Sequence, residues 1–268
     1  MSALDRERAP FPAGVWQAID AAAAAAARTM LTARRFLDVE GPFGLGLTTI
    51  EGGGDRRHGP EGDDAVAVMG RAVPVPMLWR SFPLSLRRLS AHLEHGQPLD
   101  LTAVDNAAEA VARLEDRLVY YGDPSAGLLG LLGAPGGTEI RGGDWARVDE
   151  ALRDVLAAVT ALDEAGFRGP YALVAAPALY NGLFRRYADS DLLQVEHLGR
   201  LCTLGIFKAP IDGAAVVDPR VGRLVIGQDL MAGFAWSDGV QARLYLSESL
   251  VLRFDDPAAV CRIALGGG

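Results

Sequence analysis

The sequence is poor in cysteine, in long apolar runs and in basic residues, and each shortage excludes a class of protein. Cys202 and Cys261 are too few for a disulfide framework and lack metal-ligand spacing, so a reducing cytoplasm is expected. No run of about 18 apolar residues could span a membrane, and the charged start MSALDRERAPFP does not predict a secretory signal. Lysine and arginine together number 26 against 34 aspartates and glutamates, and this balance argues against a nucleic-acid groove.

Motifs of catalysis and cofactor binding are also missing. There is no nucleophile elbow, no Walker A loop, no dinucleotide fingerprint and no zinc-type CxxC pair. Gly127, Gly130 and Gly133 have the spacing of a phosphate loop, but leucines stand between them and no lysine follows, which favours a packed turn or hinge. His92 and His95 lack the spacing of a zinc-binding helix and are expected on the surface.

What is present is a chain of 268 residues, 50% of them hydrophobic, which is enough for one large core or two joined ones. Apolar spacing and capping residues predict helices at residues 15–36, 85–96, 102–121, 144–166, 177–187 and 192–201. The first of these contains seven consecutive alanines, which allow close helix packing or act as helical filler. Thr102 with Asp105 resembles a capping box, Asp144 is a predicted helix cap, and Asp191 is well placed to cap the last helix.

Strand patterns complete this outline. Residues 171–175 are expected to form a buried strand, residues 206–227 several short strands, and residues 242–254 a long alternating strand. Residues 44–72 are glycine-rich and charged between short β-prone runs, so they have little core of their own. We expect them to form an extended arm that a partner orders.

Three acidic sites need an explanation. Glu248 falls on the apolar face of residues 242–254, which requires a partner or an interface. Glu115 and Asp116 lie inside the 102–121 helix with no evident basic or metal partner along the sequence, and structural pairing is the favoured interpretation. The loop Asp189-Ser190-Asp191, with Glu196 and His197 nearby, would attract cations if it were repeated around a symmetry axis; otherwise it is a solvated turn and the start of a helix.

Five blocks of sequence carry a family resemblance: RERAPFPAGVWQAID, ARRFLDVEGPFG, LEDRLVYYGDPSAGLLGLL, GFRGPYALVAAPALYNGL and VIGQDLMAGFAWSDGVQARLYLSESLVLRF. In their order and spacing they resemble the encapsulins (family 1, linocin-like), bacterial nanocompartment shell proteins. The resemblance implies an α+β fold of the tailed-phage major capsid protein type (Hong Kong 97 type). It places a P-domain at 1–45, 79–129 and 227–268, an extended E-loop at 46–78, and an A-domain at 130–226.

The function that this resemblance implies is shell building rather than catalysis. The chain would form an icosahedral homo-oligomer in the cytoplasm, with T = 1 expected before T = 3, and would bind neither nucleic acid nor membrane. It would enclose a ferritin-like iron-storage protein or a dye-decolorising peroxidase, held through a C-terminal targeting peptide. Two alternatives are a phage or prophage major capsid protein and a free α/β enzyme with a site at the glycine-rich stretch.

The resemblance also implies a cargo-peptide groove between the N-terminal helix and the C-terminal strands. The matching positions are Arg34, Phe36, Asp38, Asp229 and Leu230. Arg34 and Asp38 would make polar contacts, and the apolar residues would receive peptide side chains. The alanine run stands where the family often has bulkier and charged residues, which would make the groove shallower or change its specificity.

A second implied site is the five-fold pore loop, formed by Tyr187, Asp189, Ser190 and Asp191. Its two aspartates would give the pore a negative ring that favours cations such as ferrous iron. Some relatives bind flavin through an aromatic residue in the short helix after the E-loop, where this chain has Arg87. No flavin, other cofactor or resident metal is therefore expected.

Overall fold

Helix α1 (Ala13–Met30) begins directly after Pro12 and ends six residues before the predicted limit at residue 36. The computed structural model describes residues 4–59, 65–187 and 191–265. After Met30 the chain turns through Thr32 into the 3₁₀ helix η2 (Ala33–Arg35). The Asp116 carboxylate accepts hydrogen bonds from the backbone N–H groups of Thr32 and Ala33, which a continued helix would have directed to its own carbonyls.

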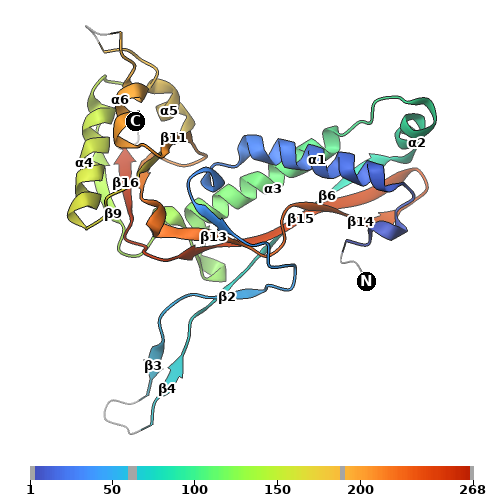
Figure 1. Ribbon diagram of the computed structural model, residues 1–268, viewed down its shortest axis with the longest axis horizontal. Helices are drawn as coiled ribbons and strands as arrows, with labels where there is room; N and C mark the ends of the chain where they lie inside the picture. Colours follow the sequence, from blue (N-terminus) through green and yellow to red (C-terminus); the bar gives the residue numbers. More distant parts are fainter. Residues whose placement is uncertain (1–3, 60–64, 188–190, 266–268) are drawn as a thin grey trace.

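Helix α3 (Thr102–Tyr121) lies along α1, and Figure 1 shows the two helices together over one face of a long sheet. Ala27 of α1 and Ala112 of α3 are buried in one cluster, so the alanine run does permit close helix approach. The bounds of α3 agree with the prediction, but its cap does not. Leu101 is the N-cap residue, and the Asp100 carboxylate, rather than a capping box, accepts from the Thr102 N–H.

The long sheet is organised around β15 (Gln241–Phe254), the predicted alternating strand. Residues 242–247 of β15 pair with β14 (Met231–Ser237) on one edge and with β6 (Met77–Ser85) on the other, and residues 250–254 pair with β13 (Gly222–Ile226), which precedes β14 along the same edge. Strand β1 (Asp38–Glu40) pairs in parallel with β13. We call this sheet with α1 and α3 the elongated body.

A second sheet has the strand order β11-β10-β12-β16-β9. Its strands are β9 (Thr138–Gly142), β10 (Ala172–Ala175), β11 (Gly205–Lys208), β12 (Ala214–Val217) and β16 (Val260–Leu265). Helices α4 (Glu150–Glu164), α5 (Pro177–Gly182) and α6 (Gln194–Leu201) accompany it, and we call this unit the compact body. Every residue of β10 and β12 is buried, as the apolar runs predict.

The boundary predicted between residues 226 and 227 does not separate the strands of the two sheets. Strand β13 lies before that boundary but belongs to the long sheet, and β16 lies after it but pairs with β12 and β9 in the compact body. The assignment of all strands after residue 227 to one unit is therefore wrong for β16. The chain crosses between the bodies more often than local patterns show, because pairing partners lie far apart in the sequence.

Three predicted helix ends are also corrected. Asp144 caps a turn by accepting from the Ala146 N–H, and α4 begins only at Glu150. Helix α5 ends at Gly182 rather than at Tyr187. Asp191 does not cap the following helix, because the Glu196 carboxylate accepts from the N–H of the N-cap residue Leu193.

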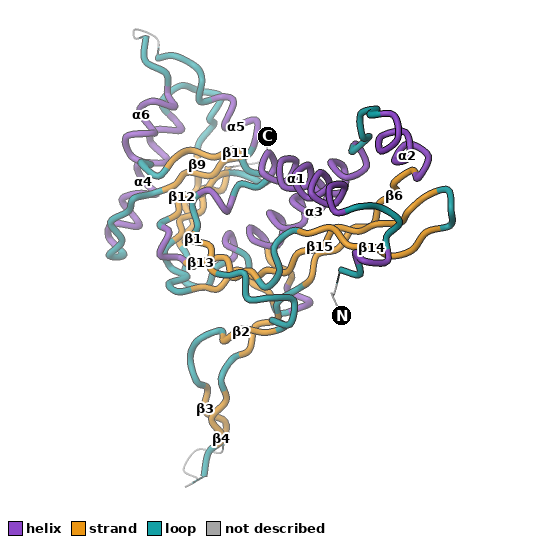
Figure 2. Tube along the Cα trace, turned by 45° about the vertical axis from the view of Figure 1, so that its right-hand side comes forward, coloured by secondary structure: helices purple, strands orange, loops and turns teal. Residues whose placement is uncertain are grey.

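The predicted arm is a narrow ribbon that projects away from both bodies (Figures 1 and 2). Strand β2 (Thr49–Glu51) pairs with β5 (Ala72–Pro74), and β3 (Arg56–His58) pairs with β4 (Ala67–Met69). All residues of β3 and β4 are exposed, so the chain itself provides no core for them. Helix α2 (Leu86–His95) follows β6 and ends at Gly96, whose φ of 65° suits the predicted glycine end.

The glycine-rich stretch after α3 is a packed turn, as predicted. It contains β7 (Gly122–Asp123), β8 (Leu128–Leu129) and the 3₁₀ helices η3 (Pro124–Ala126) and η4 (Leu131–Gly133). A Cβ atom at Gly130 would collide with the Tyr121 backbone, so only glycine fits there.

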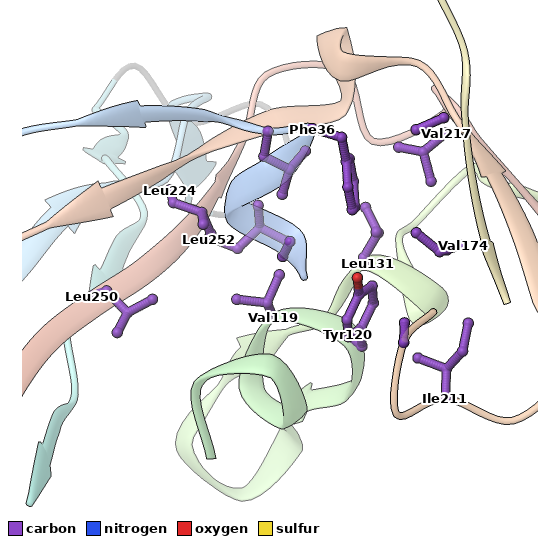
Figure 3. Close-up of a cluster of buried hydrophobic side chains, with 14 of the residues drawn as sticks. Phe36, Val119, Tyr120, Leu131, Val174, Ile211, Val217, Leu224, Leu250 and Leu252 are labelled. Carbon is purple, nitrogen blue, oxygen red and sulfur yellow. The ribbon is translucent and has the colours of Figure 1, made fainter. Parts of the chain in front are cut away.

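One apolar core joins the two bodies. Figure 3 shows Leu131 and Tyr120 between Val119 and Leu252 on one side and Val174 and Ile211 on the other. The short 3₁₀ helices η1 (Arg6–Arg8) and η5 (Pro219–Val221) complete the structure. Within the described residues, no helix is both long enough and apolar enough to cross a membrane.

Candidate functional site

A cavity of about 470 Å³ opens between the end of α1, the turn after it, and the loop that joins β13 to β14. Its volume falls within the range of roughly 300–1,000 Å³ that is typical of ligand pockets. The apolar part of its wall consists of small and aliphatic side chains: Ala24, Ala27, Leu31, Val39 and Leu230. Alanine at positions 24 and 27 leaves room that larger side chains would fill, so the sequence of α1 creates this space.

Arg34 is the central charged residue of the cavity wall. Its Nε donates to Glu115 Oε1 at 2.7 Å, and its Nη2 donates to Glu115 Oε2 at 2.8 Å and to Glu248 Oε2 at 3.0 Å. Its Nη1 donates to Asp229 Oδ1 at 3.3 Å. Both glutamates are buried, whereas Asp229 is exposed. One guanidinium group therefore ties η2 to α3, to β15 and to the loop before β14.

The three carboxylates change the protonation of this cluster. Burial lowers the pKa of Arg34, but the hydrogen bonds and charges of Glu115, Glu248 and Asp229 outweigh it and raise this pKa above its ordinary value. Burial, followed by the charge of Glu115, raises the pKa of Glu248 well above its ordinary value. A side-chain hydrogen bond with Glu115 raises the pKa of Glu248 further.

A second buried polar group supports the same turn. The Thr32 hydroxyl donates to Asp116 Oδ2 at 2.8 Å and lies 2.8 Å from the Tyr120 hydroxyl. Burial raises the pKa of Asp116 to about 6, although the donors from Thr32 and Ala33 act in the opposite direction. The pairing predicted for Glu115 and Asp116 is therefore confirmed, with Arg34 and Thr32 as the partners.

The structure brings together three of the five residues predicted for the groove. Arg34, Asp229 and Leu230 line the cavity. Phe36 is buried in the core instead, with its ring 5.5 Å from that of Phe207, so it offers no surface to a ligand. Asp38 is exposed in β1, opposite Arg223 of β13, and does not line the cavity.

Sequence reasoning missed several cavity residues. Arg28, Arg35, Glu248 and the alanines of α1 line the wall but were not assigned to the groove. The signal for Glu248 was present, because a carboxylate on an apolar strand face needs a buried partner. The signal for Arg28 is its position one residue after the buried Ala27, which places it at the edge of the helix face that packs inward.

The predicted pore loop is described only at its ends. Asp189 and Ser190 lie outside the described residues, whereas Tyr187 and Asp191 lie within them. Asp191 is exposed and forms an ion pair with Arg186 at 3.2 Å, so part of its charge is balanced within the loop. Tyr187 packs its ring 5.0 Å from that of His197. Arg87, the position compared with a flavin-binding aromatic residue, is exposed on α2.

Comparison with solved structures defines the class of protein. The virus-like particle from Pyrococcus furiosus matches with a TM-score of 0.70 at 22% identity, covering 93% of this chain and 99% of the other. The capsid of Myoviridae phage XM1 matches with a TM-score of 0.60 at 16% identity, covering 86% and 90%. The fold is therefore the tailed-phage capsid fold, as the resemblance predicted.

Sequence comparison then identifies the family. The model of the family described as "Encapsulating protein for peroxidase" (Linocin_M18) matches residues 1–251. The type 1 encapsulin shell protein of Rhodococcus erythropolis is 30% identical over 268 residues, which cover 98% of this chain and 100% of the relative. This chain belongs to the Linocin_M18 family of encapsulating proteins, whose role is structural.

The buried charge cluster gives a first prediction. Arg34→Met should destabilise the subunit by about 3–5 kcal/mol, because it leaves Glu115 and the Glu248 carboxyl buried without their cation. The measurement is urea unfolding at a fixed subunit concentration. Arg35→Met is the matched control, because Arg35 is exposed and should change stability by no more than about 0.5 kcal/mol. Equal effects of the two changes would contradict the role assigned to Arg34.

The pH dependence of stability gives a second prediction. Because the folded-state pKa of Glu248 lies above its ordinary value of 4.5, its contribution to stability is fully present below pH 4.5 and is lost as the pH rises through the raised pKa. Glu248→Gln imitates the protonated carboxyl, so stability should fall less steeply with rising pH than in the unsubstituted protein. A residual slope up to about pH 6 is expected from Asp116. Identical slopes in both proteins would mean that Glu248 is already ionised.

Proposed function

We propose that this protein self-assembles into an icosahedral shell that encloses a cargo protein. The observation that carries this proposal is a capsid fold with an arm that has no core of its own. Strands β3 and β4 are exposed along their whole length, and strands of this kind gain stability when another chain covers them. Repetition of one such contact around closed symmetry axes produces a shell.

The outer face of the long sheet provides a surface for that contact. Helices α1 and α3 cover one face, while the other exposes Met77, Trp79 and Trp236 to 55%, 51% and 51%. Trp79 packs against Tyr245 with ring centroids 5.9 Å apart. The arm exposes apolar side chains of its own, including Val68 and Met69. Exposed apolar surface of this extent is typical of protein–protein contact.

Assembly is tested by size-exclusion chromatography followed by negative-stain electron microscopy. The unsubstituted protein should elute as a large particle and show closed shells, and a monomer or dimer would overturn the proposal. Trp79→Ser should reduce the fraction of subunits in shells by about tenfold or more, because it removes a central aromatic side chain of the exposed face. Leu114→Ser on α3 is the control, since Leu114 is an exposed apolar residue outside both the arm and this face.

For cargo, we propose that the cavity beside Arg34 receives a C-terminal targeting peptide of the enclosed protein. The cavity combines an apolar wall with charged residues at its rim, the arrangement by which grooves bind extended peptides. The description of the family supports a dye-decolorising peroxidase as the first cargo to test, with a ferritin-like protein as the second.

The groove is tested by filling it. Ala24→Phe should lower the cargo loaded per shell by about tenfold, because the new ring occupies the cavity. Ala25→Phe adds the same ring to the exposed side of α1 and should load normally. The readout is the cargo-to-shell ratio of purified particles. Equal loading of both variants, with shells intact, would place the peptide elsewhere while leaving self-assembly untouched.

We further propose that loop 187–191 lines a pore that admits cations. Asp191 is half of an ion pair with Arg186, so only part of its own charge is available to the pore. Asp189→Asn together with Asp191→Asn should slow ferrous iron uptake by loaded shells severalfold at low salt. Unchanged uptake in the doubly substituted shell would remove this part of the proposal.

A further inference from the structure

The geometry points to a peptide with acidic side chains as the occupant of the cavity beside Arg34. This inference rests on the proposed cargo groove and adds the chemistry of the segment that fills it. The occupant presents small or aliphatic side chains to the apolar wall and places aspartate or glutamate side chains beside Arg28 and Arg35.

Arg28 and Arg35 are the cations that remain available at the rim. Both line the cavity and both are exposed. The Arg35 Nη2 donates to the Arg28 carbonyl oxygen at 3.3 Å, which holds the Arg35 side chain against the end of α1. Within the part of the chain that the structure describes, no carboxylate lies within ion-pair distance of either guanidinium.

Arg34, in contrast, is already neutralised by the protein. Its donors are occupied by Glu115, Glu248 and Asp229, and the first two are buried. An incoming carboxylate would therefore have to displace one of these three partners to reach Arg34. The charge that a ligand meets at the rim is set by the exposed residues Arg28, Arg35 and Asp229.

This arrangement selects between peptides of opposite charge. Two unpaired arginines on one rim repel lysine and arginine side chains and attract carboxylates, while the single carboxylate of Asp229 is partly balanced by Arg34. The wall itself accepts only modest apolar volume, since two of its residues are alanines. An acidic peptide with small and aliphatic residues suits both the charge of the rim and the volume of the wall. A basic peptide with the same apolar residues suits only the volume of the wall.

The test uses a fluorescent protein that is co-expressed with the shell and carries one of three tails. The tails share one pattern of leucine, alanine and glycine and differ only in carrying two glutamates, two lysines or two glutamines. A Gly/Ser extension on each tail moves the terminal carboxylate away from the groove. We expect the glutamate tail to load about tenfold more than the lysine tail into unsubstituted shells, with the glutamine tail between them. The readout is fluorescence per shell after size exclusion.

Substitutions of the shell assign the preference to the rim. Arg28→Glu with Arg35→Glu should invert the order of the tails, and Arg28→Gln with Arg35→Gln should abolish it. If the double glutamate variant fails to assemble, the double glutamine variant still tests whether the two arginines cause the preference. Arg113→Glu with Arg117→Glu, two exposed residues of α3 outside the cavity wall, is the control and should keep the original order.

Three outcomes would overturn the inference. If the lysine tail loads as well as the glutamate tail, the groove does not select peptides by charge, although it still binds peptides. A fourth tail carries the two glutamines but lacks the Gly/Ser extension, so its terminal carboxylate can reach the groove. If this tail loads as well as the glutamate tail, the groove binds the carboxylate of the chain terminus and not that of a side chain. If no tail loads above an untagged fluorescent protein, the cavity is not a peptide groove, and that part of the proposed function fails with it.

Discussion

The bond between Arg34 and the buried Glu115 is the interaction on which the rest of the elongated body depends. It joins the turn after α1 to α3, and through Glu248 it reaches the long sheet. A buried carboxylate pair without a cation is strongly unfavourable, so the three elements can approach one another only with Arg34 in this place. The same constraint fixes one wall of the cavity, which is why stability and the shape of the site depend on one side chain.

The turn that positions Arg34 has its own cause. The Asp116 carboxylate accepts hydrogen bonds from the N–H groups of Thr32 and Ala33. These bonds end α1 at Met30 and direct the chain into β1. Had the helix continued to residue 36, Arg34 would lie on another helical face and Glu115 would lose its partner. The alanines of α1 matter for the same reason, because they let α3 approach closely enough for both carboxylates of α3 to reach this turn.

Local features of the fold could be predicted from the sequence, and long-range ones could not. The bounds of α3 and the glycine end of α2 agree with the prediction, since apolar spacing and a left-handed glycine are local signals. The end of α1 is set by Asp116, 84 residues away from Thr32, and the place of β16 is set by β12 and β9. No local pattern contains that information.

The site follows the same division. The need of Glu115 and Glu248 for partners was evident from their apolar surroundings, but Arg34 lies 81 and 214 residues from them. Family resemblance pointed to Arg34, Asp229 and Leu230, which line the cavity, and also to Phe36, whose side chain enters the core beside Phe207. The sequence pattern cannot show whether a side chain at the end of a short 3₁₀ turn is buried or exposed, because neither the helical nor the strand period applies there.

Strand β15 separates the two surfaces that the proposed function requires. Its side chains alternate, so Tyr245 points to the uncovered face with Trp79, while Glu248 points to the helices and reaches Arg34. The proposed subunit contacts on the first face and the proposed peptide contacts in the cavity therefore lie on opposite sides of one sheet. A substitution that tunes the peptide groove leaves the aromatic face in place, because a period of two keeps the two sets of side chains apart. In the proposed shell, this separation would allow cargo specificity to change without loss of assembly.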